Sequence, residues 1–75
     1  MISEKLKAVI LAELELDDWD LQDRTVATSV PGWDSLSHAR IIAAVEAAYG
    51  IRFRVAEVTR LEDVGQLQAL VDARA

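Results

Sequence analysis

Apolar residues recur at helical spacing in three separate segments of this chain, and that pattern restricts what the chain can form. The segments cover residues 3–15, residues 35–49, and the residues that follow 63. Residues 51–54 alternate as a strand would, but no second segment of the chain offers them a pairing partner. We therefore expect an all-α fold, a small bundle of three to four helices.

The two outer segments have plausible caps and one apolar face each. Ser3 is suited to cap the first helix, and Asp63 is suited to cap the last. The expected inward positions of these two helices are Leu6, Val9, Ile10, Leu14, Val64, Leu67, Leu70 and Val71. Gly65 falls in the first turn of the last helix, where a glycine weakens a helix by up to about 1 kcal/mol relative to alanine.

The middle segment, 35–49, predicts the longest helix, which Gly50 ends. Its core positions are expected to be Ile41, Val45 and Tyr49, with Ala48 beside them. A second, shallower apolar stripe consists of Leu36, Ala39 and Ala43. After the extended residues 51–54, the short run 55–58 is expected to make one helical turn.

Residues 16–34 lack a sustained period and are rich in aspartate, threonine, proline and glycine, which predicts a long loop. The loop nevertheless contains large apolar side chains: Leu16, Trp19, Leu21, Val26, Val30 and Trp33. A disordered linker would not carry so many of them, so we expect the loop to pack onto the helices. We place a short helical turn near residues 18–22.

Length and composition favour a carrier, adaptor or interaction module over an enzyme. The 75 residues fit a single domain, 1–75, and a domain this small buries about 60% of its unfolded surface, which leaves little room for a deep active site. The chain has no cysteine, and its single histidine, His38, cannot form a metal cluster alone. We expect no metal site and no catalytic residue.

Charge and hydropathy limit the partners. The net charge of −5 argues against nucleic acid, and no apolar run has membrane-spanning length. The N-terminus does not read as a signal peptide, so we expect a cytoplasmic protein, and a monomer. Its starting methionine, with a helix close behind, favours a free-standing chain. Charge is uneven, because residues 35–60 carry a net charge of +2 while the flanking segments are acidic.

Asp34 and Ser35 stand where the middle helix begins. The Asp34 carboxylate can accept hydrogen bonds from the first free backbone N–H groups, and Ser35 is then the first helical residue. The positive end of the helix dipole favours an anion there, such as a phosphate ester of Ser35. The simpler interpretation is an ordinary helix start. A catalytic serine served by His38 lacks a Gly-x-Ser-x-Gly motif and an oxyanion pocket, and we expect His38 to face solvent.

The run GWDSLSHARIIAAVEAAYGIRF, taken with the first helix, the long loop and the terminal LEDVGQLQALV, resembles an acyl carrier protein over essentially all 75 residues. The resemblance implies that Ser35 is esterified with 4′-phosphopantetheine, which a phosphopantetheinyl transferase takes from coenzyme A. It implies that Asp34 helps this transferase position the serine, often with a magnesium ion held in the transferase. It also implies that Leu36 contacts partners, which include acyl-loading and acyl-accepting enzymes.

The sequence departs from the commonest form of that family, in which the middle helix is acidic. Ser37, Arg40 and Ala47 occupy positions that are often acidic there, and Glu46 is the acidic residue that remains. We therefore expect a carrier of a dedicated, polyketide-type or other specialised pathway rather than of general fatty-acid synthesis. The residues expected to meet its partners are Trp33, Leu36, Ala39, Arg40, Ala43 and Glu46.

Two alternatives remain open on the sequence. The Trp33-Asp34-Ser35 form also resembles D-alanyl carriers, so the cargo is either an acyl or an aminoacyl group. The second alternative is an unmodified helical interaction module that docks a partner helix on the Leu36, Ala39 and Ala43 stripe. Such a module would tolerate Ser35→Ala with binding intact, whereas a carrier would not.

Overall fold

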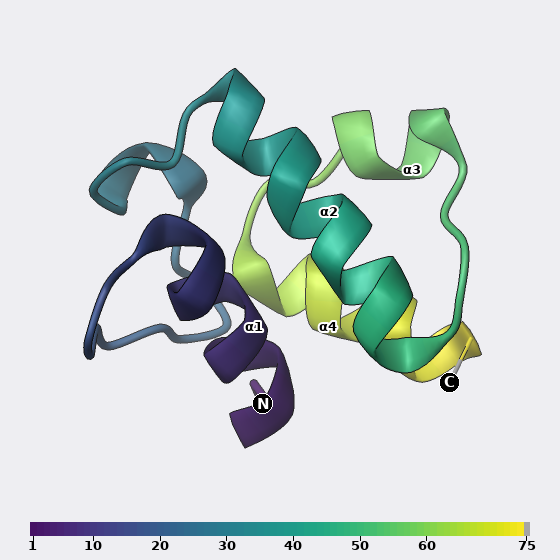
Figure 1. Ribbon diagram of the computed structural model, residues 1–75. Coiled ribbons are helices and arrows are strands. Elements are labelled where there is room, and N and C mark those ends of the chain that lie inside the picture. Colours follow the sequence, from purple (N-terminus) through teal and green to yellow (C-terminus); the bar gives the residue numbers. More distant parts are fainter. Residues whose placement is uncertain (75) are drawn as a thin grey trace.

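A computed structural model describes residues 1–74, which contain four α-helices and one short 3₁₀ helix (Figure 1). The elements are α1 (Glu4–Leu14), η1 (Ala27–Ser29), α2 (Ser35–Tyr49), α3 (Val55–Thr59) and α4 (Val64–Arg74). The described residues form no strand, so the expected all-α class is confirmed. None of their helices is long and apolar enough to cross a membrane.

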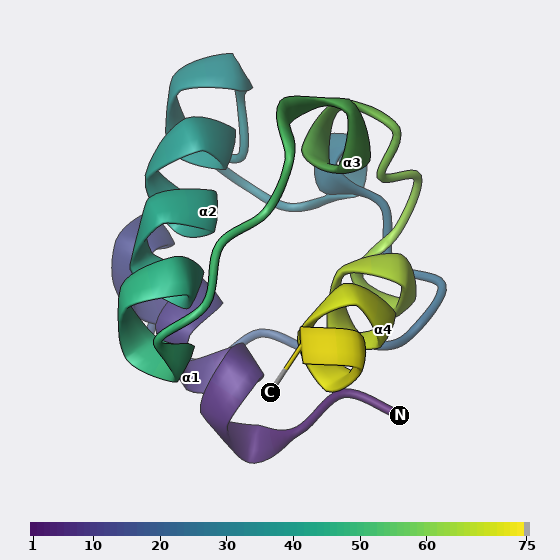
Figure 2. The same ribbon diagram turned by 90° about the vertical axis from the view of Figure 1, so that its right-hand side faces the viewer.

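The helices surround one small core. Helix α1 packs against α2, and the turned view shows α3 and α4 on the right, across from α2 (Figure 2). The side chains with at most 2% of their area exposed come from α1, α2 and α4: Leu6, Ile10, Ile41, Val45, Val64, Leu67 and Val71. Helix α3 buries none of its residues. The core therefore depends on three helices, and α3 lies over its edge.

Helix boundaries follow the capping residues that the sequence offers. The Ser3 hydroxyl accepts a hydrogen bond from the backbone N–H of Leu6 at 3.2 Å, and the Asp63 carboxylate accepts one from Gln66 at 2.9 Å. Gly50 ends α2 in the left-handed conformation, at φ 66°, which glycine adopts without steric cost. These caps confirm the expected limits of the three long helices.

Core composition differs from the expected pattern at several positions. Leu11, Ile42 and Gln68 are buried although the pattern did not single them out. Ala48 is exposed, so its expected place beside the core is wrong. The buried residues of α2 are Ile41, Ile42 and Val45, so the face that packs on the core is centred nearer to Ile42 than to Ala48.

The loop between α1 and α2 packs on the core, as expected. Leu21 and Val30 are buried, and Trp19 and Trp33 are partly buried against the core. The helical turn expected near residues 18–22 is wrong, because the turn forms at η1 instead. The Gln22 N–H donates to the Thr25 hydroxyl at 2.9 Å, a side-chain bond of the kind that competes with helical backbone bonding.

The same loop is fastened to the start of α4. The backbone N–H groups of Val64 and Gly65 donate to the carbonyl oxygens of Thr25 and Asp23, at 2.9 and 2.8 Å. A Cβ at Gly65 would lie 2.7 Å from that Asp23 oxygen. Gly65 is therefore more than a weak point of the helix, because the loop approaches the backbone too closely for any side chain.

Candidate functional site

A tight turn precedes α2. The Trp33 N–H donates to the Val30 carbonyl at 3.2 Å, which closes a four-residue turn with Pro31 and Gly32 at its centre. Gly32 has φ 79°, and proline followed by a positive-φ glycine is the signature of a type II turn. The two central residues are exposed, so the middle of the turn lies at the surface close to the first residues of α2.

Asp34 is the N-cap of α2, as the sequence predicts. Its carboxylate accepts a hydrogen bond from the Ser37 N–H at 2.8 Å. This bond is the main cause that lowers the pKa of the Asp34 carboxyl below its ordinary value of 3.8. The carboxylate is therefore ionised at neutral pH and held in a fixed orientation beside the next residue.

Ser35 is exposed and is the first residue of this 15-residue helix. At that position, backbone N–H groups lack intrahelical acceptors and the helix dipole is positive. The hydroxyl is thus reachable by another protein, and a phosphate attached to it would lie in a favourable field.

His38 does not face solvent, so that expectation is wrong. It is partly buried, and its Nδ1 accepts a hydrogen bond from the Trp33 indole N–H at 3.1 Å, while Nε2 lies 3.2 Å from the Val58 carbonyl oxygen. Because the indole nitrogen can only donate, Nδ1 must be the acceptor and Nε2 must carry the proton given to Val58. We call this pair of hydrogen bonds the Trp33–His38–Val58 bridge.

The bridge removes His38 as a base for Ser35, because both imidazole nitrogens are occupied in it. The expectation that the site holds no catalytic residue stays a prediction. The described residues also contain no cluster of three or more side chains able to hold a metal ion.

A signal for the bridge exists in the sequence, although sequence reasoning missed it. With Asp34 as N-cap, Trp33 occupies the position before the cap and His38 the fourth helical position. Apolar side chains at these two positions often contact each other and fix the angle at which the chain enters the helix. Here the two rings lie with centroids 6.1 Å apart and add a hydrogen bond to the contact.

The remaining residues expected to meet partners lie along α2. Leu36, Ala39, Arg40 and Ala43 are all exposed, and Leu36 exposes 63% of its area. Glu46 differs from them, since it is partly buried and its carboxylate accepts the backbone N–H of Phe53 at 2.8 Å. Glu46 thus holds the connector after α2 in place.

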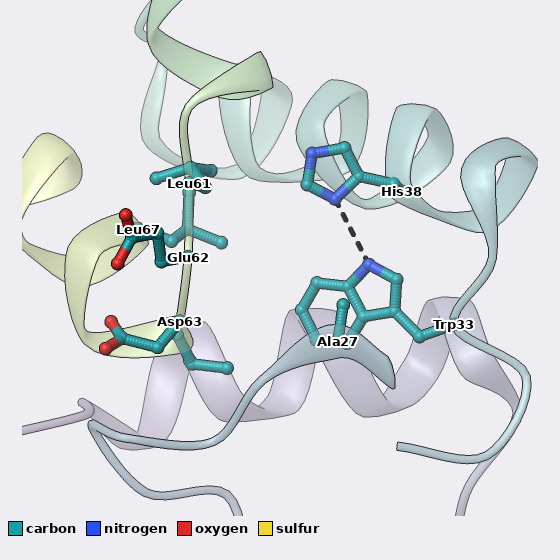
Figure 3. A pocket seen from close by; sticks show the side chains of 8 residues that line it. Ala27, Trp33, His38, Leu61, Glu62, Asp63 and Leu67 are labelled. Carbon is teal, nitrogen blue, oxygen red and sulfur yellow. Dashed lines mark hydrogen bonds between the residues drawn. The ribbon is translucent and has the colours of Figure 1, made fainter. Parts of the chain in front are cut away.

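A small cavity lies beside the bridge. Its volume is about 20 Å³, and Val64 is among its lining residues. Trp33 and His38 form one wall, and Leu61 and Leu67 lie across from them (Figure 3). Such a volume has room for about one water molecule. Trp33, which the sequence placed among packing residues, therefore packs on the core and borders this space.

Comparison with protein-family models finds no match, and no curated protein matches the sequence. A solved structure does match: the solution NMR structure of a holo acyl carrier protein from Geobacter metallireducens, with a TM-score of 0.86. The sequences are 35% identical, and the matched region covers 92% of this chain and 79% of that one. Such identity over most of both chains, together with a shared fold, shows that the present chain belongs to the acyl carrier protein family.

Proposed function

We propose that Ser35 bears a 4′-phosphopantetheine arm and that the chain carries an acyl group on it between partner enzymes. The observation that carries this proposal is the exposed Ser35 hydroxyl at the first position of α2, in a member of the acyl carrier protein family. The chain itself is then a carrier and not an enzyme. The holo state of the Geobacter protein supports the same assignment.

The residues around Ser35 suit such a group. The free N–H groups at the start of α2 favour the phosphodiester, and the type II turn keeps the serine away from the core. When bound, the arm supplies the thiol that forms a thioester, which this cysteine-free chain lacks. The Asp34 carboxylate is ionised and is fixed by the hydrogen bond from the Ser37 N–H. It is therefore placed to help a phosphopantetheinyl transferase position the serine.

The exposed side of α2 is the proposed docking surface for the transferase and for the enzymes that load and unload the cargo. Leu36 offers an apolar contact beside Ser35, flanked by Ala39 and Ala43. Arg40 contributes a positive charge, while the carboxylate of Glu46 is bonded to the connector backbone. We infer partners with an acidic or neutral surface, and a dedicated pathway rather than general fatty-acid synthesis.

The first experiment is intact mass spectrometry before and after incubation with coenzyme A, magnesium and a broad-specificity phosphopantetheinyl transferase. We expect a gain of one phosphopantetheine unit that Ser35→Ala abolishes while its circular dichroism spectrum stays helical. No gain in a folded protein that was unmodified when isolated would refute the carrier function. It would leave the unmodified docking module in its place.

Arg40 is tested by charge reversal. We expect Arg40→Glu to slow acylation of the holo protein by its own loading enzyme, because the reversed charge repels an acidic docking surface. The matched control is Arg24→Glu, which makes the same change at an exposed position in the loop, away from α2. Equal or faster acylation of Arg40→Glu would show that Arg40 is not a recognition residue.

A further inference from the structure

The interior next to the attachment site has almost no free volume. Trp33 lies two residues before Ser35 and borders the cavity of about 20 Å³. Its indole and the His38 ring face the side chains of Leu61 and Leu67 across that space (Figure 3). An apolar chain attached near Ser35 would have to displace these rings to enter the core beneath α2.

The two rings are fixed in place by the polarity of their nitrogens. The indole N–H has His38 Nδ1 as its acceptor, and the His38 Nε2–H has the Val58 carbonyl. One imidazole thereby joins the turn before Ser35, helix α2 and helix α3. Moving either ring away breaks at least one of the two hydrogen bonds, so the rings resist displacement together.

Helix α3 lies next to the cavity, because its Val58 carbonyl accepts the hydrogen bond from His38, which lines that space. None of its residues is buried, and polar contacts hold it at two places. One is the Val58 carbonyl in the bridge, and the other is the Glu57 carboxylate, whose two oxygens each lie 2.6 Å from the Arg74 guanidinium. The bridge is therefore the contact that ties α3 to α2 directly beside the cavity.

We propose that the Trp33–His38–Val58 bridge closes the interior to the cargo, so that this carrier presents its acyl group in solvent. Trp33 and His38 are then specificity-determining residues. The cargo class that suits such a carrier is a short or polar acyl group, because a long apolar chain left in water carries an unfavourable hydration free energy for every methylene. This inference rests on the proposed function, since it requires an arm on Ser35.

The test compares acetyl and octanoyl forms of the protein, made by transferring acyl-phosphopantetheine from acetyl- or octanoyl-coenzyme A with a broad-specificity transferase. Methyl-resolved NMR spectra then report on Leu61, Val64 and Leu67. In the wild-type protein we expect these methyl signals to coincide in the two forms, with no nuclear Overhauser contact to the octanoyl chain.

The variant Trp33→Ala removes the indole from the cavity wall and, with it, the Trp33–His38 hydrogen bond of the bridge. We expect its octanoyl form to show contacts between the octanoyl methylenes and the methyls of Leu61 and Leu67. The matched control is Trp19→Ala, since Trp19 is also partly buried against the core but does not line the cavity. Its octanoyl chain should remain in solvent, as in the wild-type protein.

Octanoyl contacts to the core methyls of the wild-type protein would overturn the inference, as would a folded Trp33→Ala variant that still excludes the chain. If Trp33→Ala does not fold, the wild-type spectra decide the question alone. Failure of the proposed function is distinguishable, because it would appear earlier, as the absence of any mass gain with coenzyme A.

Discussion

Replacing Gly65 by alanine should destabilise the protein, although helix propensity alone predicts the opposite. In an exposed helix, glycine to alanine gains up to about 1 kcal/mol. Here the new Cβ would lie 2.7 Å from the Asp23 carbonyl oxygen and 3.0 Å from the Asp23 Cβ. Carbon and oxygen in weak contacts stay at least about 3.3 Å apart, so the loop or α4 must move by roughly 0.6 Å.

That movement acts on two hydrogen bonds that fasten the loop to α4. They run from the N–H groups of Val64 and Gly65 to the loop carbonyls of Thr25 and Asp23. Overpacking costs about 1–3 kcal/mol, and loss of one such bond about 1 kcal/mol. After the propensity gain is subtracted, we expect Gly65→Ala to lower the free energy of unfolding by about 1–3 kcal/mol.

Urea unfolding followed by circular dichroism measures this difference. The control is Ala69→Gly, at an exposed position of the same helix, which should lose about 1 kcal/mol through propensity alone. Both changes should therefore destabilise, although they exchange the same two residues in opposite directions. An increase in stability for Gly65→Ala would refute the close approach of the loop to α4.

Two further predictions concern polar groups. Gln68→Leu should lower the free energy of unfolding by about 1–3 kcal/mol, because the buried Gln68 side chain accepts the Ser3 N–H at 2.9 Å and leucine has no acceptor to offer in its place. Urea unfolding measures this loss. It should be smaller for Gln66→Leu, because the bond from the Glu62 N–H to Gln66 is exposed and water can replace it. The pKa of the Asp34 carboxyl is lower in the folded protein than its ordinary value of 3.8. The ionised carboxylate therefore stabilises the fold fully above pH 3.8, and this stabilisation is lost as the pH falls through the folded-state pKa. Urea midpoints measured from pH 7 to pH 3 should thus fall less steeply on the acid side for Asp34→Asn, and equal slopes would contradict the assignment of this cap.

Local patterns in the sequence were enough to locate the helices and the site residue. Ser3, Asp34 and Asp63 cap the helices, and Gly50 ends α2, because capping depends on groups within a few residues of each other. The periodicity of 35–49 likewise fixed the length of α2 and so put Ser35 at its first turn. The helical turn in the loop was misplaced, since side-chain bonds such as that of Thr25 compete with local propensity.

Contacts between distant segments were decided only by the tertiary structure. The role of Gly65 depends on Asp23, 42 positions earlier, and the buried Gln68 side chain finds its backbone donor in the N-terminal Ser3. His38 looks like a surface residue in sequence, yet its second nitrogen bonds to Val58 from another helix. Helical spacing states which residues share a face, but not which segment covers it, because that choice follows from how all the helices pack together.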